Sequence, residues 1–578
     1  MGQKGNTVSK LRHFSQLSHS RRAMIFKGTV LKLGETRMEK LYNGILLPEI
    51  WPPVLPETSL DRPLPVPYLD RSLPDGAPGA HPEVIDITAG RQLFADDFLI
   101  ARMSGLSRVW GTPAVRENPV FVPSTPREMN GGFCPCACPF NGGVFRDPLD
   151  GKIRMWYHSG WFDGTGLAVS SDGINWNRVS DSILPHEPGW MRDGDAVWLD
   201  EDSADPDRRY KMMVFYRIFD EDPRYYPFMP RHYHDVPGSV PPREVTRLYA
   251  SPDGLNWTLI GETSPCGDNS TFFYNPFRKK WVYSLRTFSS LDSRVRTRGM
   301  AEADDLFGGA RWKPEDVRFW QRADLLDAPD PELGYYSQLY NLDCAAYESV
   351  MLGMFTLFLG PPNPIAEAAG TPKICDLFLG FSRDGFHFSR ENRNAFLSSS
   401  RVPGRWDYGY LHPANGLFTA EKDTLTFYYS AFSGDSPKLG HNLYAGGSVG
   451  AAVLRRDGFA SLAPEGSGKG FVLTEKLTLR ADGPVFLHIN ALCGSGGCIR
   501  AEITDDKGVP LPGYSADECT PFGGDSTDAV ISFGPDTEEG GIPAALPEVF
   551  RLRFALSGAS LYSFWFSSEP PRRDQAPG

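Results

Sequence analysis

The sequence predicts an all-β protein, a five-bladed β-propeller followed by a C-terminal β-sandwich, and two observations carry this prediction. First, an aromatic-rich apolar run returns five times between about residues 140 and 462, followed by a short strand that usually ends in Asp-Gly and an aromatic residue. Such repeats are typical of propellers, because each blade must bury its faces against its neighbours. Second, after about Pro464 this period gives way to short strands of alternating apolar and polar residues, as in a sandwich.

Each repeat is recognised by its apolar run. The five runs are Lys152–His158, Tyr210–Tyr216, Trp281–Arg286, Val350–Phe358 and Leu425–Ser430. Three of the strands that follow share an S-x-D-G-x-x-aromatic signature, at Ser170–Trp176, Ser251–Trp257 and Ser382–Phe388. The two remaining copies are degenerate, one near Asp304 with Trp312 and one at Arg456–Phe459. Five copies predict five blades.

The repeat and its flanks predict four segments. Residues 1–82 form a basic tail and a proline-rich arm, 83–463 the propeller, 464–568 the sandwich and 569–578 a polar tail. The arm, Leu47–Pro82, holds too many prolines for a central strand and is expected to lie extended on the surface. A ring built from one chain needs its last blade completed by the other end. The segments Arg91–Ile100 and Asn118–Pro123 are our candidates for that closing strand.

Composition fits a propeller with an appended domain and excludes some partners. Among 578 residues, 59 Gly and 50 Pro indicate many turns. The net charge of −12 argues against binding nucleic-acid phosphates or anionic lipid. No stretch approaches the roughly 18 apolar residues that a membrane span requires. We therefore expect neither a nucleic-acid nor a membrane partner.

The nine cysteines, an odd number in a long chain, do not predict a disulfide framework. Cys134, Cys136 and Cys138 are spaced too closely for a structural zinc site, so we interpret them as buried thiols. The basic N-terminus lacks the apolar core of a secretory signal. We expect a cytoplasmic location, no metal and no cofactor, and the oligomeric state is left open.

Side chains that could bind or react with a ligand are expected at the propeller axis, where the first strands of all blades converge. The segments before the apolar runs are Asn141–Val144, Arg192–Val197, Asp268–Thr271, Asp343–Glu348 and His412–Gly416. Several carboxylates around one funnel are what glycoside hydrolysis requires, one protonated as the acid and one ionised as nucleophile or base. Crowding raises the pKa of at least one of them. The alternative is that these carboxylates accept hydrogen bonds from neighbouring strands.

Five blades, a trailing sandwich and an Arg-Asp opening to the second blade resemble the five-bladed propeller glycoside hydrolases of families 32, 43 and 68, over about residues 90–568. The best stretch, Arg192–Trp198, is similar to the R-D-P-x-V-x-W of family 32 fructosidases, whose aspartate stabilises the transition state. The resemblance implies this role for Asp193. Pro139–Gly142 resembles the second half of the family's nucleophile motif D-P-N-G, but Pro139 stands in the nucleophile's place. Asp97 is a candidate substitute from a neighbouring strand.

The acid motif E-C-P of the family has no clean copy in this sequence. Tyr347–Ser349 keeps the glutamate, and Asp268 sits in an equivalent place one blade earlier. We predict Glu348 as the general acid, Asp193 as the orienting carboxylate and Asp97 or Asp268 as nucleophile or base. The predicted substrate-binding residues are Arg192, Asn141, His412, Trp406 and Asp195. His412 could instead bind a channel ion or a strand carbonyl, and Arg192 could hold Asp193 ionised.

Two other functions remain open. A non-catalytic propeller could bind a sugar or a protein through the same face. The Asp-Gly turns also resemble the Asp-boxes of sialidases, although such turns lie at blade edges, so Asp172, Asp253 and Asp384 are interpreted as structural. A sialidase would need three arginines on the axis, and Arg286 and Arg296 are candidates without an evident third. The leading hypothesis is a glycosidase acting on a terminal sugar or short oligosaccharide.

Overall fold

A computed structural model describes residues 38–74, 76–117, 119–185, 187–219, 242–465, 468–481, 483–534 and 546–568. The predicted tails at 1–37 and 569–578 lie outside these residues. The described part is nearly all β-structure, with one α-helix, α1 (Asn363–Ala369). Its 3-10 helices are η1 (Pro67–Leu69), η2 (Asp97–Leu99), η3 (Asn130–Gly132), η4 (Pro206–Arg208), η7 (Gly308–Ala310) and η8 (Pro314–Asp316). None of the helices described is long and apolar enough to cross a membrane.

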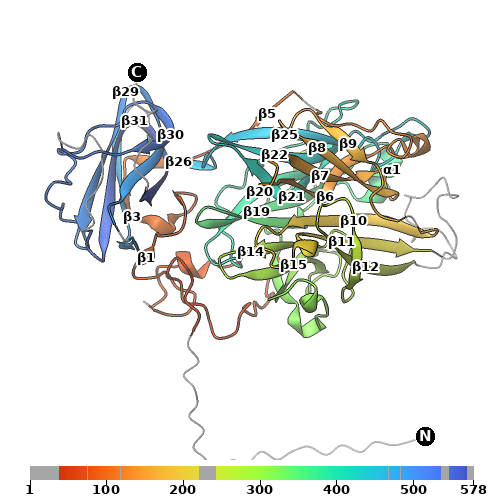
Figure 1. Cartoon of the computed structure of the whole chain (residues 1–578), viewed down its shortest axis with the longest axis horizontal. Helices are drawn as coiled ribbons and strands as arrows, with labels where there is room; N and C mark the ends of the chain where they lie inside the picture. The colour runs from red at the N-terminus through yellow and green to blue at the C-terminus, as the bar shows by residue number, and fades with distance from the viewer. Residues whose placement is uncertain are drawn as a thin grey trace, which may run out of the picture. The chain divides into compact units, whose positions relative to one another are not determined.

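Five antiparallel sheets form the blades of the predicted propeller (Figure 1). The first blade contains β6 (Ala137–Arg146), β7 (Ile153–Ser159), β8 (Gly164–Ser170) and β9 (Asn177–Ser180). The second contains β10 (Trp190–Leu199), β11 (Tyr210–Ile218), β12 (Arg243–Ser251) and β13 (Thr258–Glu262). The third contains β14 (Thr271–Asn275), β15 (Lys280–Phe288), β16 (Arg296–Ala303) and β17 (Arg318–Gln321).

The fourth blade contains β18 (Gln338–Tyr347), β19 (Val350–Gly360) and β20 (Ile374–Ser382). The fifth contains β21 (Gly409–Ala420), β22 (Thr424–Phe432), β25 (Ser448–Arg455) and β5 (Ala114–Val115), with the small hairpin β23 (Asp435–Ser436) and β24 (Gly440–His441) beside it. The innermost strands β6, β10, β14, β18 and β21 contact one another in turn around a ring. The predicted five-bladed fold is confirmed.

The ring is closed by the N-terminal side of the chain, through β5 and the residues that follow it. The outermost strand of the fifth blade is β5, whose Val115 pairs with Ala452 of β25. Near Asn118–Pro123, Phe121 adds a single bridge to Val449. The stretch Arg91–Ile100 belongs instead to the C-terminal sheet. Closure by N-terminal material was therefore predicted correctly. Of the two candidate segments, Asn118–Pro123 takes part in it through Val120 and Phe121, whereas Arg91–Ile100 does not, and β5 itself was not predicted.

The Asp-Gly turns explain why the repeat is visible in the sequence. Asp253 accepts hydrogen bonds from the backbone of its own turn, at Leu255 and Asn256. Gly254 has φ +75°, and a Cβ there would lie 2.5 Å from the Trp156 ring of the first blade, so only glycine fits. Trp156 Nε1 in turn donates to the Gly254 carbonyl at 2.8 Å. Each such turn therefore joins two blades and has a structural role.

The C-terminal part is the predicted β-sandwich, built on two long strands, β29 (Phe486–Asp505) and β31 (Phe550–Ser567), drawn in blue in Figure 1. Its other strands are β1 (Ile85–Asp86), β2 (Gln92–Leu93), β3 (Ile100–Ser104), β4 (Leu106–Trp110), β26 (Ala460–Pro464), β27 (Lys469–Thr474), β28 (Leu477–Thr478) and β30 (Asp525–Val530). Residues 85–110 thus precede the propeller in sequence but pair within the sandwich. The predicted boundary at residue 83 missed this crossover.

The proline-rich arm follows the surface of blades three and four. Arg322 donates hydrogen bonds to the carbonyls of Ser59 and Leu60, at 2.6 and 2.8 Å. Tyr68, fully buried, donates to the His387 carbonyl at 2.8 Å. The bonds from Arg322 use backbone carbonyls of the arm, which an extended proline-rich segment leaves unpaired.

Candidate functional site at the propeller axis

The innermost strands bring a ring of polar side chains together at one mouth of the propeller. Asn141 of β6 lies at its centre. Its Oδ1 accepts from Asn341 Nδ2 at 2.8 Å and lies 3.3 Å from His412 Nδ1, and its Nδ2 lies 3.5 Å from Asn269 Oδ1. Blades one, three, four and five therefore meet at Asn141. Asn141 and Asn269 have φ of +72° and +54°, a left-handed conformation that asparagine tolerates better than most residues.

Asn415 closes the channel below this ring. It follows His412 along β21, and its Nδ2 donates to the carbonyls of Val197 and Phe272, both at 3.0 Å. Those carbonyls belong to the innermost strands of blades two and three. The side chains that can meet a ligand thus lie at the end where the innermost strands begin.

Asp193 and Asp268 share one arginine at this mouth. Arg217, on β11, contacts Asp193 Oδ2 through Nη1 and lies 2.8 Å from Asp268 Oδ2 through Nη2. Arg286, on β15, lies 2.7 Å from Asp268 Oδ1. Burial opposes ionisation of Asp268, but Arg286 and Arg217 outweigh it and lower its pKa to about 2. Asp268 is therefore an ionised carboxylate at neutral pH.

Asp343 has the opposite environment. It lies on β18, two residues after Asn341, and its side chain is 1% exposed. Burial raises its pKa to about 6, although Thr271, the charge of Arg298 and a 2.6 Å hydrogen bond from Asn341 Nδ2 favour the ionised form. We named its segment as axial from the sequence but chose Glu348 from it. The alternation along β18, which places Asn341 and Asp343 on the same face, is the signal that could have found Asp343.

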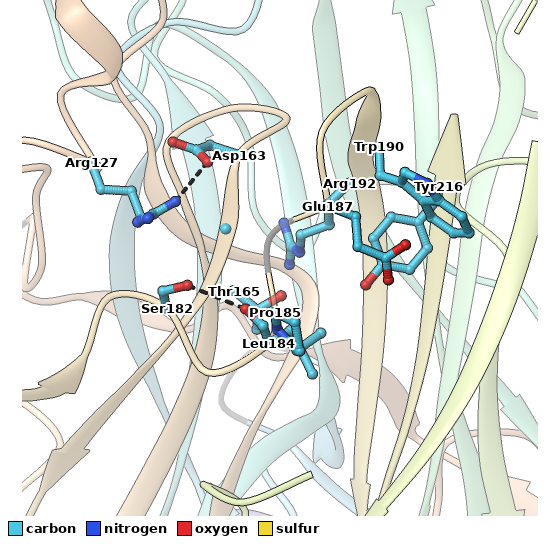
Figure 2. A pocket seen from close by; sticks show the side chains of 11 residues that line it. Arg127, Asp163, Thr165, Ser182, Leu184, Pro185, Glu187, Trp190, Arg192 and Tyr216 are labelled. Carbon is cyan, nitrogen blue, oxygen red and sulfur yellow. Dashed lines mark hydrogen bonds and ion pairs between the residues drawn. The ribbon is translucent and has the colours of Figure 1, made fainter. Parts of the chain in front are cut away.

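Arg192 lies beside this mouth in a small cavity between blades one and two (Figure 2). Figure 2 shows its guanidinium between the Arg127–Asp163 ion pair and the group of Glu187, Trp190 and Tyr216. Arg192 is 2% exposed and pairs with Asp195, but its Nε and Nη1 have no hydrogen-bond partner among the described residues. Buried donors of this kind are normally satisfied, so a ligand group or water is expected here.

Asp195, the partner of Arg192, also has a raised pKa. Burial raises its pKa, while Arg192 and a 3.1 Å hydrogen bond from Thr165 Oγ1 act against that rise. A β-bulge interrupts the pairing of β10 between Arg192 and Gly194, at Asp193. Bulges re-aim side chains, and this one lies where Arg192 and Asp193 must reach different partners.

Two buried histidines, His412 and His158, flank the ring of Phe140. The ring centroid of Phe140 lies 4.2 Å from that of His412 and 5.3 Å from that of His158. Burial lowers both pKa values well below the usual range, aided by Arg192 for His158 and by Lys373 for His412. Both imidazoles are therefore neutral. Neither nitrogen of His158, nor Nε2 of His412, has a hydrogen-bond partner among the described residues.

Three predicted site residues lie away from this mouth. Glu348 is in the β18–β19 turn, at the far end of β18, where it pairs with Arg456 at 2.8 Å. Asp97, in η2, pairs with Arg108 at 2.5 Å beside the sandwich strands. Trp406 packs against Tyr429 within the fifth blade, with ring centroids 5.9 Å apart. The expectation that Glu348 and Asp97 share a funnel with Asp193 and Asp268 is therefore not met.

The cysteine cluster lies in the core between blades one and five. Cys134, Cys136 and Cys138 are buried, and burial raises the pKa of Cys134 and of Cys136 well above the usual range. Cys136 and Cys138 have their sulfur atoms 3.6 Å apart. Over the described ranges, no group of three or more His, Cys, Asp or Glu side chains is arranged to hold a metal ion.

No protein-family model matches the sequence, and no curated protein is similar to it. Solved structures with a similar course of the chain include an N-acetylgalactosamine deacetylase from F. plautii, at 14% identity and TM-score 0.41, covering 62% of this chain and 97% of that one. The β-1,2-mannobiose phosphorylase of Listeria innocua has 12% identity and TM-score 0.38, with coverages of 59% and 96%. The family 32 β-fructofuranosidase of Bombyx mori has 13% identity and TM-score 0.34, with coverages of 77% and 93%. The five sheets themselves establish the propeller.

Proposed function

We propose that this protein is a glycoside hydrolase that acts on a terminal sugar or short oligosaccharide at the mouth of the propeller axis. One observation supports the proposal above the others. Asp268, just before the innermost strand β14, and Asp343, on the neighbouring innermost strand β18, have pKa values displaced in opposite directions, to about 2 and about 6. Hydrolysis of a glycosidic bond needs such a pair, because one carboxyl group must hold a proton while the other is ionised.

Asp343 takes the role of the general acid in this proposal. A carboxyl group with a pKa near 6 retains part of its proton near neutral pH and can donate it to the leaving glycosidic oxygen. Asp268, ionised and 21% exposed at its side chain, takes the role of base or nucleophile. The charges of both carboxylates favour the protonated form of Arg298, although burial lowers its pKa overall. Asp193 orients Arg217 and through it Asp268.

The substrate is bound by the polar ring and by the cavity of Arg192. The unpartnered nitrogens of His412 and His158 and the free donors of Arg192 match the oxygens of sugar hydroxyls. Trp190 and Tyr216 give the cavity of Figure 2 an aromatic wall of the kind that packs against sugar rings. We propose Asn141, His412, Arg192 and Asp195 as substrate-binding residues.

The second candidate is a propeller that binds a sugar without cleaving it. The observation in its favour is that Asp193 and Asp268 are both held in ion pairs with Arg217, which leaves fewer lone pairs for chemistry. The sialidase-like alternative gains a third arginine, because Arg217 joins Arg286 at Asp268, with Arg296 nearby. It requires the arginines to leave Asp268 for a substrate carboxylate.

Hydrolysis of a panel of aryl-glycosides and oligosaccharides by the full chain separates these candidates. Asp343→Asn is expected to lower kcat by about 100-fold to 10,000-fold, the usual contribution of a general acid. Asp376→Asn is the matched control: Asp376 is a buried carboxyl group of the same blade, on β20, with a raised pKa and partners in Ser399 and Arg401. An equal loss in both variants, or no hydrolysis of any substrate by the wild type, would refute the hydrolase assignment.

A further inference from the structure

We infer that the mouth binds the anionic substituent of a saccharide, a carboxylate or sulfate, beside Tyr340. That the ligand is a saccharide rests on the proposed function. That the ligand carries an anionic group rests on the charged residues of this chain. Three cations meet around Tyr340, namely Arg296 and Arg298 of β16 and Lys373, which precedes β20. None of the three has a carboxylate partner among the ion pairs of the described ranges.

Arg296 is the most accessible of these cations. Its guanidinium carbon lies 5.4 Å from the centroid of the Tyr340 ring and 5.7 Å from that of Phe358. Its Nη1 donates to Gln338 Oε1 at 3.1 Å, a neutral acceptor. Arg296 acts on Asp268 from a distance, but Asp268 is already paired with Arg217 and Arg286. Arg296 therefore adds a positive charge that no carboxylate nearby is left to neutralise.

Arg298 and Lys373 are buried, with 0% and 1% exposure. Arg298 donates through Nη1 to the Asn269 carbonyl at 2.7 Å and through Nη2 to the Tyr340 carbonyl, while its Nε has no hydrogen-bond partner in the described part of the chain. Burial lowers its pKa to about 9. The remaining cation, Lys373, donates to the hydroxyls of Tyr340 and Tyr444 at 3.2 and 3.5 Å. Carbonyls, hydroxyls and aromatic faces are neutral, so neither cation has a carboxylate in direct contact, although Asp343 and Asp268 act on Arg298 from a distance.

This local excess of positive charge contrasts with the chain as a whole, whose net charge is −12. Burying an unpaired cation is costly, and here two buried cations and the partly exposed Arg296 lie around one side chain. Cations gathered at one mouth raise the local concentration of anions. Guanidinium groups bind carboxylates and sulfate-like oxyanions through paired charge-assisted hydrogen bonds. The polar ring at Asn141 and His412 supplies partners for the hydroxyls of the same sugar.

The test measures binding of matched saccharides to the full-length protein, each set comprising a neutral sugar, its uronic acid and its sulfate ester, by calorimetry or tryptophan fluorescence. We expect the anionic members to bind at least about tenfold more tightly at 0.05 M salt, with the preference shrinking at about 0.5 M as the charges are screened. Arg296→Gln and Lys373→Gln are expected to remove most of the preference. Arg294→Gln is the control, because Arg294 lies two residues away with 88% of its side chain exposed.

The uronic acid and the sulfate ester in each set show whether the bound group is a carboxylate or a sulfate. A preference for either one over the neutral sugar supports the inference. Equal affinity for neutral and anionic members, no binding of any member, or an undiminished preference in Arg296→Gln would overturn it. Because Arg296 is partly exposed, its variant is informative even where Lys373→Gln does not fold. Asp343→Asn separates this inference from the proposed function: it should lose hydrolysis and keep the preference for anionic over neutral sugars. Anion-selective binding without cleavage would refute only the hydrolase, and cleavage of neutral sugars without anion preference would refute only this inference.

Discussion

The two ends of the innermost strand β18 carry carboxylates and arginines in clusters that differ in how completely their charges are paired. At its far end, where the propeller meets the sandwich, the junction cluster consists of Arg91, Glu348, Arg456 and Asp457. Asp457, fully buried, accepts from Arg91 Nη1 at 2.8 Å and from Tyr347 OH at 2.5 Å, and also from Asn490 and Ser563 of the sandwich. Every charged group of the junction cluster has an oppositely charged partner.

At the mouth, the same residue types are left incompletely matched. Arg296, Arg298 and Lys373 have no carboxylate partner in the described ranges, and the carboxyl groups of Asp268 and Asp343 have pKa values displaced in opposite directions. Fully satisfied polar networks fix the position of the elements that they join. Unsatisfied groups near an axis are costly unless a ligand completes them. The completeness of charge pairing therefore distinguishes the structural cluster from the candidate site. The residue types of the two clusters alone do not distinguish them.

The largest expected effect on stability comes from breaking the junction cluster. Asp457→Ala removes the acceptor of the Tyr347 hydroxyl and one of the two carboxylate partners of Arg91, and removing one partner of a buried ion pair typically costs about 3–5 kcal/mol. Urea denaturation followed by intrinsic fluorescence measures this loss in the free energy of unfolding. Saccharide binding at the mouth should be unchanged under native conditions. A loss below about 1 kcal/mol would mean that the cluster does not join the two domains.

A pH-dependent effect is expected from Asp343. Its pKa in the folded protein, about 6, exceeds the ordinary value of 3.8, so the folded state holds the proton more tightly than the unfolded state does. This contribution to stability is fully present below about pH 4 and is lost as the pH rises through 6, by about 1–3 kcal/mol. Denaturation at pH 4 and 7 should show this decline in the wild type and a smaller one in Asp343→Asn. Identical declines in the two proteins would contradict the raised pKa.

The smallest effect is expected from Glu348→Gln, the substitution at the residue that the sequence favoured as the acid. In the wild type the Arg91 backbone N–H lies 3.1 Å from Oε2 of Glu348, and the amide oxygen of glutamine keeps this acceptor. The substitution removes the negative charge that pairs with Arg456. With Glu348 partly exposed, a loss of about 1 kcal/mol in unfolding free energy is expected, near the range of ordinary ion pairs. Thermal unfolding checks it, with Glu391→Gln, an exposed partner of Arg108, as the comparison.

The fold could be predicted because its sequence signals are local. The turn at Gly254 requires glycine, and the position of Trp156 that packs on it requires an indole. The packing between these two blades is therefore specified by residues of the repeats themselves. Residues 85–110 escaped prediction because their strands are short and pair with β26, β27, β28 and β31, hundreds of residues later. No local pattern records a partner that distant.

The axial residues could be predicted only in part. Asn141, Asp193, Asp268 and His412 were found because each begins an innermost strand, and the structure brings them to one mouth. Their chemical roles stay predictions. Arg217 was missed because it lies near the end of β11, the second strand of its blade. Asp343 was missed because its raised pKa arises from burial. Glu348 was chosen because it matches part of the family's acid motif, but it occupies a turn with φ +51° at the opposite end of β18.

The most direct test of the account compares Asp268→Asn with Glu348→Gln in kcat/KM on the best saccharide substrate of the full-length protein. Asp268 is an ionised carboxylate at the mouth, and Glu348 is a member of the junction cluster. We predict a loss of at least about 100-fold for Asp268→Asn and a change within about twofold for Glu348→Gln. The reverse result, with activity lost in Glu348→Gln and retained in Asp268→Asn, would contradict a reaction at the mouth.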